Sequence, residues 1–130
     1  MAAAATAFII GTSPQFWDQI PSAGPTYSAT VGTKLIFRYS AYHNVYLLPS
    51  KEAYDNCDFS GATWLAGENQ DGGEGDLPNL YETVAVETGT KYFSCDIGCE
   101  DMHCIHCRNG QRIAVTITVG SPPPPPAAPP

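Results

Sequence analysis

Residues 112–119 read Arg-Ile-Ala-Val-Thr-Ile-Thr-Val, and this stretch indicates the fold class of the chain. Its larger apolar residues, Ile113, Val115, Ile117 and Val119, occupy every second position. A period of two places such side chains on one face of an extended segment. The stretch therefore predicts a half-buried β-strand rather than a helix.

Three further segments predict strands in the same way. They are residues 34–39 (Lys-Leu-Ile-Phe-Arg-Tyr), 82–87 (Glu-Thr-Val-Ala-Val-Glu) and 91–95 (Lys-Tyr-Phe-Ser-Cys). A turn at residues 88–90 joins the last two. Helix is scarce, although residues 50–56 can form a turn or two with Ser50 as the N-cap. We therefore expect an all-β sandwich or barrel with one or two short helical turns.

The composition limits the possible functions. A chain of 130 residues with 43% hydrophobic content can form one domain with a buried core, and no apolar run approaches the length of a membrane-spanning helix. Six Lys and Arg against 13 Asp and Glu give a net charge of -7, which disfavours a nucleic-acid partner and favours basic surfaces. The first residues lack the features of a signal peptide, so we expect a mature or trimmed form.

The C-terminus and one internal segment predict irregular structure. Residues 121–130 contain seven of the 12 prolines and predict a polyproline II tail, so the folded domain is expected to span residues 1–120. Residues 66–76 contain four glycines and four acidic residues. They predict a solvated loop, and a calcium site is the alternative, although the EF-hand ligand spacing is absent.

Five cysteines and three histidines contain the chemically informative pattern. Four of the cysteines lie within the thirteen residues 95–107, together with His103 and His106. Cys57 and His43 lie earlier in the chain. An odd number of cysteines leaves one thiol without a disulfide partner in an exported chain. Two kinds of metal site could use that thiol.

A zinc site is the first hypothesis. The four thiolates that it would use are Cys95, Cys99, Cys104 and Cys107. The last two have the spacing of a zinc knuckle. However, the segment has no second knuckle, and this site leaves Cys57 and His43 without a role.

A copper site is the second hypothesis. One thiolate, two imidazoles and a weak axial donor suit a copper ion that transfers electrons. Cys95 shares a strand face with Phe93, so its sulfur is expected to point inward. His43 follows another predicted strand, while His106 and Gln111 lie in the loop and turn after Cys95. Because protein groups fill every position, the site predicts outer-sphere electron transfer rather than an enzyme.

Four short segments resemble the phytocyanins, the plant-type blue copper proteins. They are residues 43–45 (His-Asn-Val), 54–57 (Tyr-Asp-Asn-Cys), 92–95 (Tyr-Phe-Ser-Cys) and 106–111 (His-Cys-Arg-Asn-Gly-Gln). The resemblance extends from about Ile9 to Val119. It implies a cupredoxin-like Greek-key β-sandwich and a type 1 copper protein that carries single electrons.

The resemblance also implies the ligands. His43, Cys95 and His106 would be the equatorial ligands of one copper ion that cycles between Cu(I) and Cu(II). Gln111 would be the axial ligand, which makes the chain similar to the stellacyanin branch. Asn44 is expected to form a hydrogen bond to the loop of Cys95 and to fix both ligands.

A disulfide between Cys57 and Cys107 is implied by the same resemblance. With Cys95 as a ligand, Cys99 and Cys104 would form a second disulfide.

The chain departs from the family between Cys95 and His106. Ten residues intervene, whereas the family pattern has about four. We expect a disulfide within this insert to keep it compact, so that the ligand loop retains its geometry. His103 is an alternative to His106, since it is also followed by a cysteine, but only His106 precedes Cys-x-x-Gly-Gln.

Localisation and partners follow from the resemblance and from the cysteines. Disulfides need an oxidising compartment, and the Pro-rich tail resembles those of cell-wall members, so we expect a secreted protein at the cell wall or the outer face of the plasma membrane. The partner would be a basic docking surface or a small-molecule reductant, the chain a monomer, and any membrane attachment a lost C-terminal anchor. A structural cell-wall protein and a copper-storage protein that uses Met102 and His103 are the alternatives.

Overall fold

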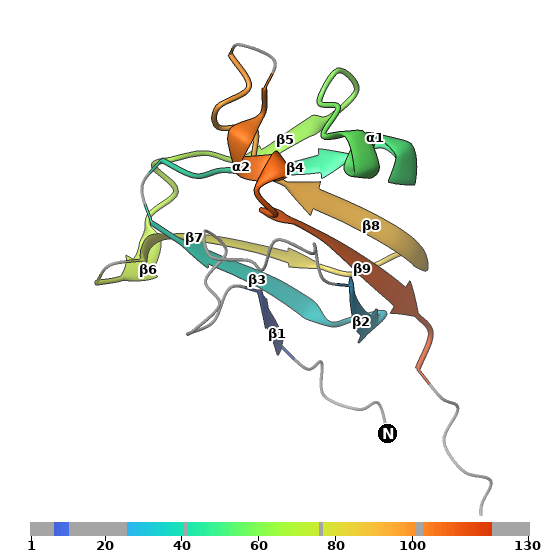
Figure 1. Cartoon of the computed structure of the whole chain (residues 1–130). Helices are drawn as coiled ribbons and strands as arrows, with labels where there is room; N and C mark the ends of the chain where they lie inside the picture. Colours follow the sequence, from blue (N-terminus) through green and yellow to red (C-terminus); the bar gives the residue numbers. More distant parts are fainter. Residues whose placement is uncertain (1–6, 11–25, 41, 76, 101–102, 121–130) are drawn as a thin grey trace, which may run out of the picture.

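A computed structural model describes residues 7–10, 26–40, 42–75, 77–100 and 103–120 (Figure 1). The predicted tail at residues 121–130 lies outside the described residues, as do the first six residues and Met102.

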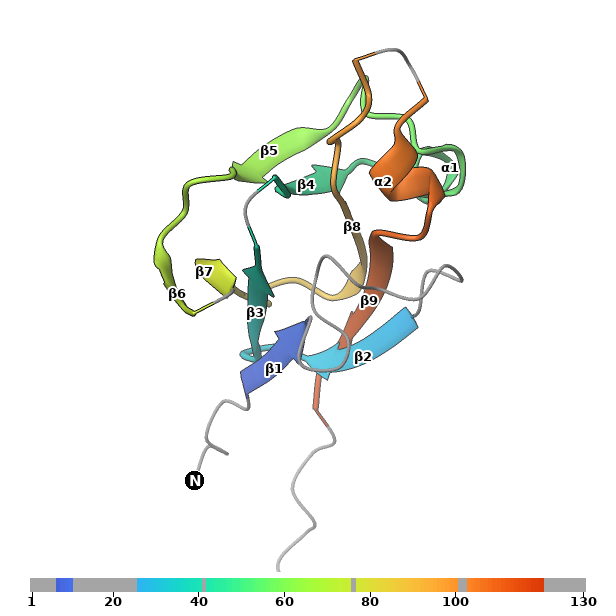
Figure 2. The ribbon, with the colours of Figure 1, turned by 60° about the vertical axis from the view of Figure 1, so that its left-hand side comes forward.

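Two β-sheets pack face to face, as Figures 1 and 2 show from two directions. One sheet has the order β1 (Ala7–Ile10), β3 (Lys34–Tyr39), β7 (Leu77–Val84) and β6 (Gly72–Glu74). The other has the order β2 (Thr26–Thr30), β9 (Arg112–Thr118), β8 (Gly89–Ser94), β4 (Val45–Leu48) and β5 (Thr63–Ala66). The β1–β3 and β2–β9 pairs are parallel, and the other pairs are antiparallel. The predicted all-β sandwich is confirmed.

The core lies between the sheets, where β3, β8 and β9 contribute most of the buried side chains. Ile113, Val115 and Ile117 of β9 are buried, as the period of two predicted, but Ala114 between them is also buried, and Val119 lies beyond the strand and is 72% exposed. Phe93 of β8 lies opposite Ile113 in the antiparallel register of β8 and β9. Because β8 and β9 are central neighbours, their ends are fixed by pairing on both sides, and so are the residues that follow them.

The strand predicted at residues 82–87 is displaced toward the N-terminus. It ends at Val84, and the side chains of Val84 and Val86 are 48% and 72% exposed, whereas Ala85 is 4% exposed. The inward face carries Tyr81 and Ala85 instead of the valines. Pairing with β3 sets this register, because a shift of one residue exchanges the two faces of a strand.

Two short helices lie beside the five-stranded sheet. Helix α1 (Lys51–Asn56) begins at Ser50, whose Oγ accepts a hydrogen bond from the Ala53 N–H at 3.1 Å, so the predicted N-cap is confirmed. Helix α2 (Ile105–Arg108) was not predicted. Neither of the helices in the described residues is long and apolar enough to cross a membrane.

The acidic segment at residues 66–76 is not entirely a loop. It contains β6, which pairs with β7. Glycine permits this pairing, because a Cβ on Gly73 would overlap the Leu77 carbonyl oxygen.

Candidate metal centre

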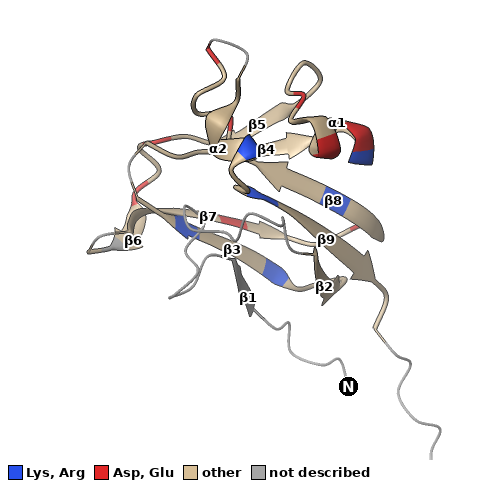
Figure 3. Cartoon of the chain, viewed as in Figure 1, with Lys and Arg blue, Asp and Glu red and all other residues tan. Residues whose placement is uncertain are grey.

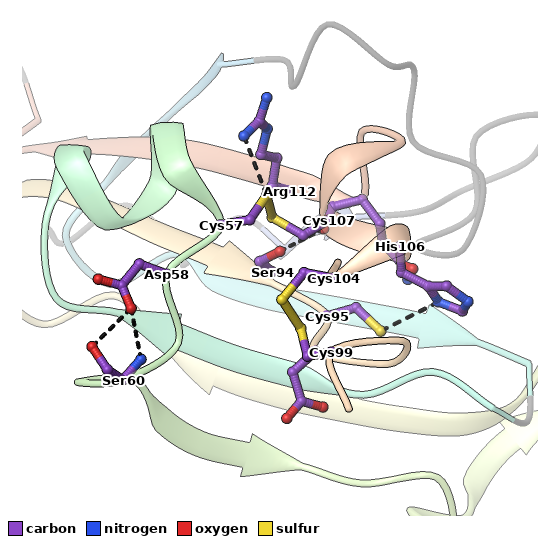
Figure 4. The surroundings of a disulfide bond; sticks show 12 residues. Cys57, Asp58, Ser60, Ser94, Cys95, Cys99, Cys104, His106, Cys107 and Arg112 are labelled. Atoms are coloured by element: carbon purple, nitrogen blue, oxygen red, sulfur yellow. Dashed lines mark hydrogen bonds between the residues drawn. A yellow bond between two sulfur atoms is a disulfide. The ribbon is translucent and has the colours of Figure 1, made fainter. Parts of the chain in front are cut away.

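Three side chains from three separate connections meet at one end of the sandwich. His43 lies between β3 and β4, Cys95 directly follows β8, and His106 lies in α2. Their donor atoms all lie within 4.8 Å of one another. Cys95 Sγ is 3.7 Å from His106 Nδ1 (Figure 4), and the two imidazole centroids are 4.8 Å apart. The geometry thus gathers one sulfur and two imidazoles at one point.

The end of β8 fixes Cys95. Its side chain is completely buried, and it is the one free cysteine of the chain. Its backbone N–H donates to the Gln111 carbonyl oxygen at 3.3 Å, and the buried Ser94 hydroxyl donates to the same oxygen at 2.8 Å. These bonds join the end of β8 to the turn before β9.

Two opposing effects act on the ionisation of the Cys95 thiol. Burial raises the pKa of Cys95 to about 12, while hydrogen bonds from the backbone N–H groups of Ile97 and Asn44 act in the opposite direction. Burial penalises the charged form, whereas the two N–H donors stabilise it. A bound cation would supply the remaining stabilisation of a thiolate here.

Gln111 directs its amide oxygen at the same cluster. Its Oε1 lies 3.0 Å from His43 Nδ1. The side chain is only 6% exposed, and its Nε2 is a buried nitrogen with no hydrogen-bond partner. The backbone N–H of Gln111 donates to the His106 carbonyl oxygen at 2.9 Å, so the turn places it close behind α2.

Asn44 joins the loop that contains His43 to the loop that contains Cys95. Its Nδ2 donates to Asp96 Oδ1 at 2.6 Å, and the Asp96 N–H donates to Asn44 Oδ1 at 3.0 Å. This confirms the expected hydrogen bond between Asn44 and the Cys95 loop. The pair holds the residues next to His43 and Cys95 together.

Two disulfides use the other four cysteines. Cys57, at the end of α1, is bonded to Cys107 of α2, and Cys99 is bonded to Cys104 within the insert (Figure 4). These are the pairings that the resemblance implies. They remove three of the four thiols that a Cys95-containing zinc site would need.

The remaining candidates do not join the cluster. His103 is exposed in the insert, and it is not part of the group formed by His43, Cys95 and His106. Within the described ranges, no other group of three histidine, cysteine or acidic side chains is close enough to hold a metal ion, and the calcium alternative for residues 66–76 also involves Asp76, which lies outside the described residues.

Sequence reasoning missed two groups near Cys95, namely the N–H of Ile97, which donates to the sulfur, and the hydroxyl of Ser94, which donates to the Gln111 carbonyl. The N–H of Ile97 leaves no mark in the sequence, because every residue except proline carries one. Ser94 had a weak signal, namely a small polar residue between two inward-facing residues, Phe93 and Cys95.

The donor set fits copper. A soft sulfur, two imidazole nitrogens and a neutral amide oxygen are the ligand types of a blue-copper site, whereas hard cations prefer several oxygen ligands. The fit of copper to this site depends on two observations, namely the types of the donor atoms and their closeness to one another.

The comparison with known sequences gives a plant relative. Uclacyanin-3 from Arabidopsis thaliana is 37% identical over 93 residues, which make up 71% of this chain and 34% of the relative. The chain thus spans about a third of the length of that protein. No protein-family model matches the chain.

Solved structures share the fold. Cucumber stellacyanin, solved with Cu²⁺, superposes with a TM-score of 0.60 at 24% identity, over 90% of this chain and 99% of that one. Spinach plantacyanin gives 0.54 at 21% identity, over 87% and 100%, and the cucumber basic protein, a blue copper protein, gives 0.54 at 20% identity, over 86% and 99%. The chain is thus similar in sequence to uclacyanin-3 over 93 residues, and it has the same fold as these three solved structures.

Proposed function

We propose that the chain is a type 1 copper protein that carries single electrons by outer-sphere transfer. His43, Cys95 and His106 are the equatorial ligands, and Gln111 is the axial ligand. The observation that supports this most strongly is the convergence of the three donor atoms within 4.8 Å around a free, buried cysteine. Copper bound to such ligands supplies one-electron exchange between Cu(I) and Cu(II).

The chain holds these ligands in place from several sides. The bonds of Ser94 and Cys95 to the Gln111 carbonyl restrict Cys95 and Gln111, and the pair formed by Asn44 and Asp96 restricts the residues next to His43 and Cys95. A site that is fixed in this way changes little when its charge changes, which favours rapid electron exchange. His43 and His106 are both partly exposed whereas Cys95 is buried, so electrons enter and leave by the edge of an imidazole ring, and we assign this role to His106, which lies in the connection after Cys95.

The negative charge of the chain favours a positively charged redox partner. Figure 3 shows acidic residues on the insert and on the loops on either side of β5. All three lysines, Lys34, Lys51 and Lys91, form ion pairs with acidic residues, so the positive charge of the lysines is locally neutralised and the net charge of -7 comes from the other acidic residues. A basic protein surface or a cationic small-molecule reductant is attracted to such a chain, and salt weakens the attraction.

The disulfides and the plant relative support a location outside the cytosol. Both disulfides need an oxidising compartment, and the plant relative supports a secreted protein of the cell wall or the outer face of the plasma membrane. The chain acts there as a monomeric carrier and not as an enzyme.

Addition of Cu²⁺ to the metal-free protein tests the proposal. We expect an intense visible band at one equivalent of copper, which Cys95→Ser abolishes and the control His103→Ala retains. A chain that stays colourless, or one that keeps the band after Cys95→Ser, contradicts it. A second tight equivalent that His103→Ala removes would instead favour copper storage.

A further inference from the structure

The insert between Cys95 and His106 leaves the domain and returns at nearly the same point. Its disulfide joins Cys99 to Cys104, and their Cα atoms lie 3.8 Å apart. This is the separation of consecutive residues across a trans peptide bond. The two residues that flank residues 100–103 are therefore as close together as chain neighbours, and Figures 1 and 2 show the described ends of the insert projecting from the end of the sandwich that contains α2.

The base of the insert is closely packed. Gly98 has a φ of +85°, and a Cβ at this position would overlap the Ile105 side chain and lie 3.2 Å from the Ile105 nitrogen. The Cys99 N–H donates to the Asp96 carbonyl oxygen at 3.0 Å, which turns the chain directly after Cys95. The outgoing and returning segments thus touch beside the disulfide.

The returning segment begins the helix that contains His106. The Cys104 carbonyl accepts the first hydrogen bond of α2, from the Arg108 N–H at 2.9 Å. On the other side of His106, Cys107 is bonded to Cys57, and the sulfurs of both disulfides lie in one cluster that packs against Phe59. A four-residue helix is too short to be stable alone, so its anchors must hold it.

We propose that Cys99 and Cys104 are positioning residues of the metal site. Their disulfide brings together the two ends of the insert in the ten-residue connection between Cys95 and His106, so the path between these two residues is effectively shorter. The disulfide thereby holds α2 and the His106 imidazole beside Cys95. The effect on α2 depends only on the contacts above, whereas its effect on copper affinity rests on the proposed function. Without the disulfide, α2 would open locally while the two sheets stay folded.

Two variants separate this role from general stabilisation. The first is Cys99→Ser with Cys104→Ser, which opens the ring. The second combines these substitutions with deletion of residues 100–103, so that a peptide bond replaces the disulfide across the 3.8 Å gap. Glu100→Gln is the matched control, because it changes an exposed residue of the ring and leaves the disulfide intact.

Amide hydrogen exchange of the metal-free proteins is the first measurement. The amides of Arg108, Asn109 and Gln111 bond to carbonyls of Cys104, Ile105 and His106, and so report on α2. We expect them to exchange on the order of tenfold faster in the double-serine variant. This is the order of magnitude of the stabilisation that a disulfide provides when it closes a loop of only a few residues. These amides return toward the wild-type rate in the deletion variant, while β9 amides stay unchanged in all three.

Copper affinity, measured by competition with a chelator, is the second measurement. We expect about a tenfold weaker affinity in the double-serine variant and recovery in the deletion variant. The inference is overturned by any of three results. These are unchanged exchange rates of the α2 amides in the double-serine variant, exchange rates and copper affinity that do not recover in the deletion variant, and unfolding of the whole double-serine variant. If the wild type forms no coloured copper complex but α2 responds as expected, the proposed function fails and the role of the disulfide in holding α2 stands.

Discussion

Asn44 and Asp96 bind each other through two hydrogen bonds, of 2.6 Å between Asn44 Nδ2 and Asp96 Oδ1 and of 3.0 Å between the Asp96 nitrogen and Asn44 Oδ1. One residue follows His43 and the other follows Cys95. The contact therefore fixes the relative position of two ligand loops that are 52 residues apart in the chain.

Asn44→Asp tests this contact with little change in shape. The substitution keeps the oxygen that accepts from the Asp96 N–H, but it places a second carboxylate where the amide donated to Asp96. We expect the free energy of unfolding to fall by about 1–3 kcal/mol, the cost of a broken hydrogen bond in a partly buried site. Denaturant unfolding of the metal-free protein measures it. Asn69→Asp, at an exposed turn, is the control and should change stability little.

The acidity of Cys95 predicts how metal binding depends on pH. Burial raises the pKa of the thiol to about 12, so the metal-free site keeps its proton at neutral pH. Copper binds the thiolate, so each ion displaces that proton and the affinity should rise about tenfold per pH unit between pH 8 and pH 10. Chelator competition across this range measures the slope.

Cys95→Ser is the control for the pH dependence, because the hydroxyl does not ionise in this range. A wild-type affinity that stays flat between pH 8 and pH 10 would show that binding releases no proton from Cys95.

The same pKa affects the stability of the metal-free fold. The folded thiol has a higher pKa than its ordinary value of 9.0, so the folded state holds the proton more tightly than the unfolded state. The resulting stabilisation is fully present below pH 9 and is lost as pH rises toward 12. Burial also raises the pKa of Tyr39, so the ionisation of this tyrosine likewise lowers the stability of the fold as the pH rises. Wild type should therefore lose more stability than Cys95→Ser between pH 8 and pH 10.5, and parallel losses would contradict this.

Local sequence patterns predicted some elements well and others poorly for identifiable reasons. Strand β9 and the Ser50 cap were predictable because alternation and capping are local properties. The segment around Val84 was not, since Thr-Val-Ala-Val suits either face until pairing with β3 chooses one. Helix α2 could not be predicted from the local sequence, because its four residues are held by two disulfides. One joins Cys107 of the helix to Cys57, far away in the chain, and the other joins Cys104, directly before the helix, to Cys99 across the insert.

The site shows the same division. The residue types and order of His43, Cys95, His106 and Gln111 carried a family resemblance, so the ligand hypothesis came from sequence. The N–H donors to the Cys95 sulfur could not be predicted, because they depend on backbone direction after the strand ends. The parallel β1–β3 and β2–β9 pairs were likewise hidden, since their partners are set by the whole fold.

Gln111→Met should raise the reduction potential. An amide oxygen is a harder donor than a thioether and favours the oxidised ion, so its replacement stabilises the reduced ion. We expect a rise of at least about 59 mV, which is a tenfold change in a one-electron equilibrium. Redox titration of the copper-loaded protein measures it, and the retained visible band shows that copper is still bound. An unchanged potential would mean that Gln111 is not the axial ligand.

Arg112 offers a test of how the turn that contains Gln111, the proposed axial ligand, is supported from outside the cluster. Its Nη1 donates to the carbonyl oxygens of Tyr54 and Asp55 at 2.8 and 3.1 Å and lies 3.4 Å from Cys57 Sγ, while the guanidinium lies over the Tyr54 ring. The residue after Gln111 is thereby tied to the end of α1 and to the Cys57 disulfide.

Arg112→Met keeps much of the aliphatic stem but leaves the carbonyls at the end of α1 without this donor. We expect a loss of about 1–3 kcal/mol in the free energy of unfolding. Arg112→Lys should recover only part of it, because an ammonium can donate to the carbonyls but lacks the planar guanidinium that stacks on the Tyr54 ring. The exposed Arg108 supplies the control, since Arg108→Met removes the same charge from α2. Equal losses in the Arg108 and Arg112 variants would show that charge alone matters, and a larger loss at Arg112 would show that its contacts with α1 stabilise the turn that presents Gln111.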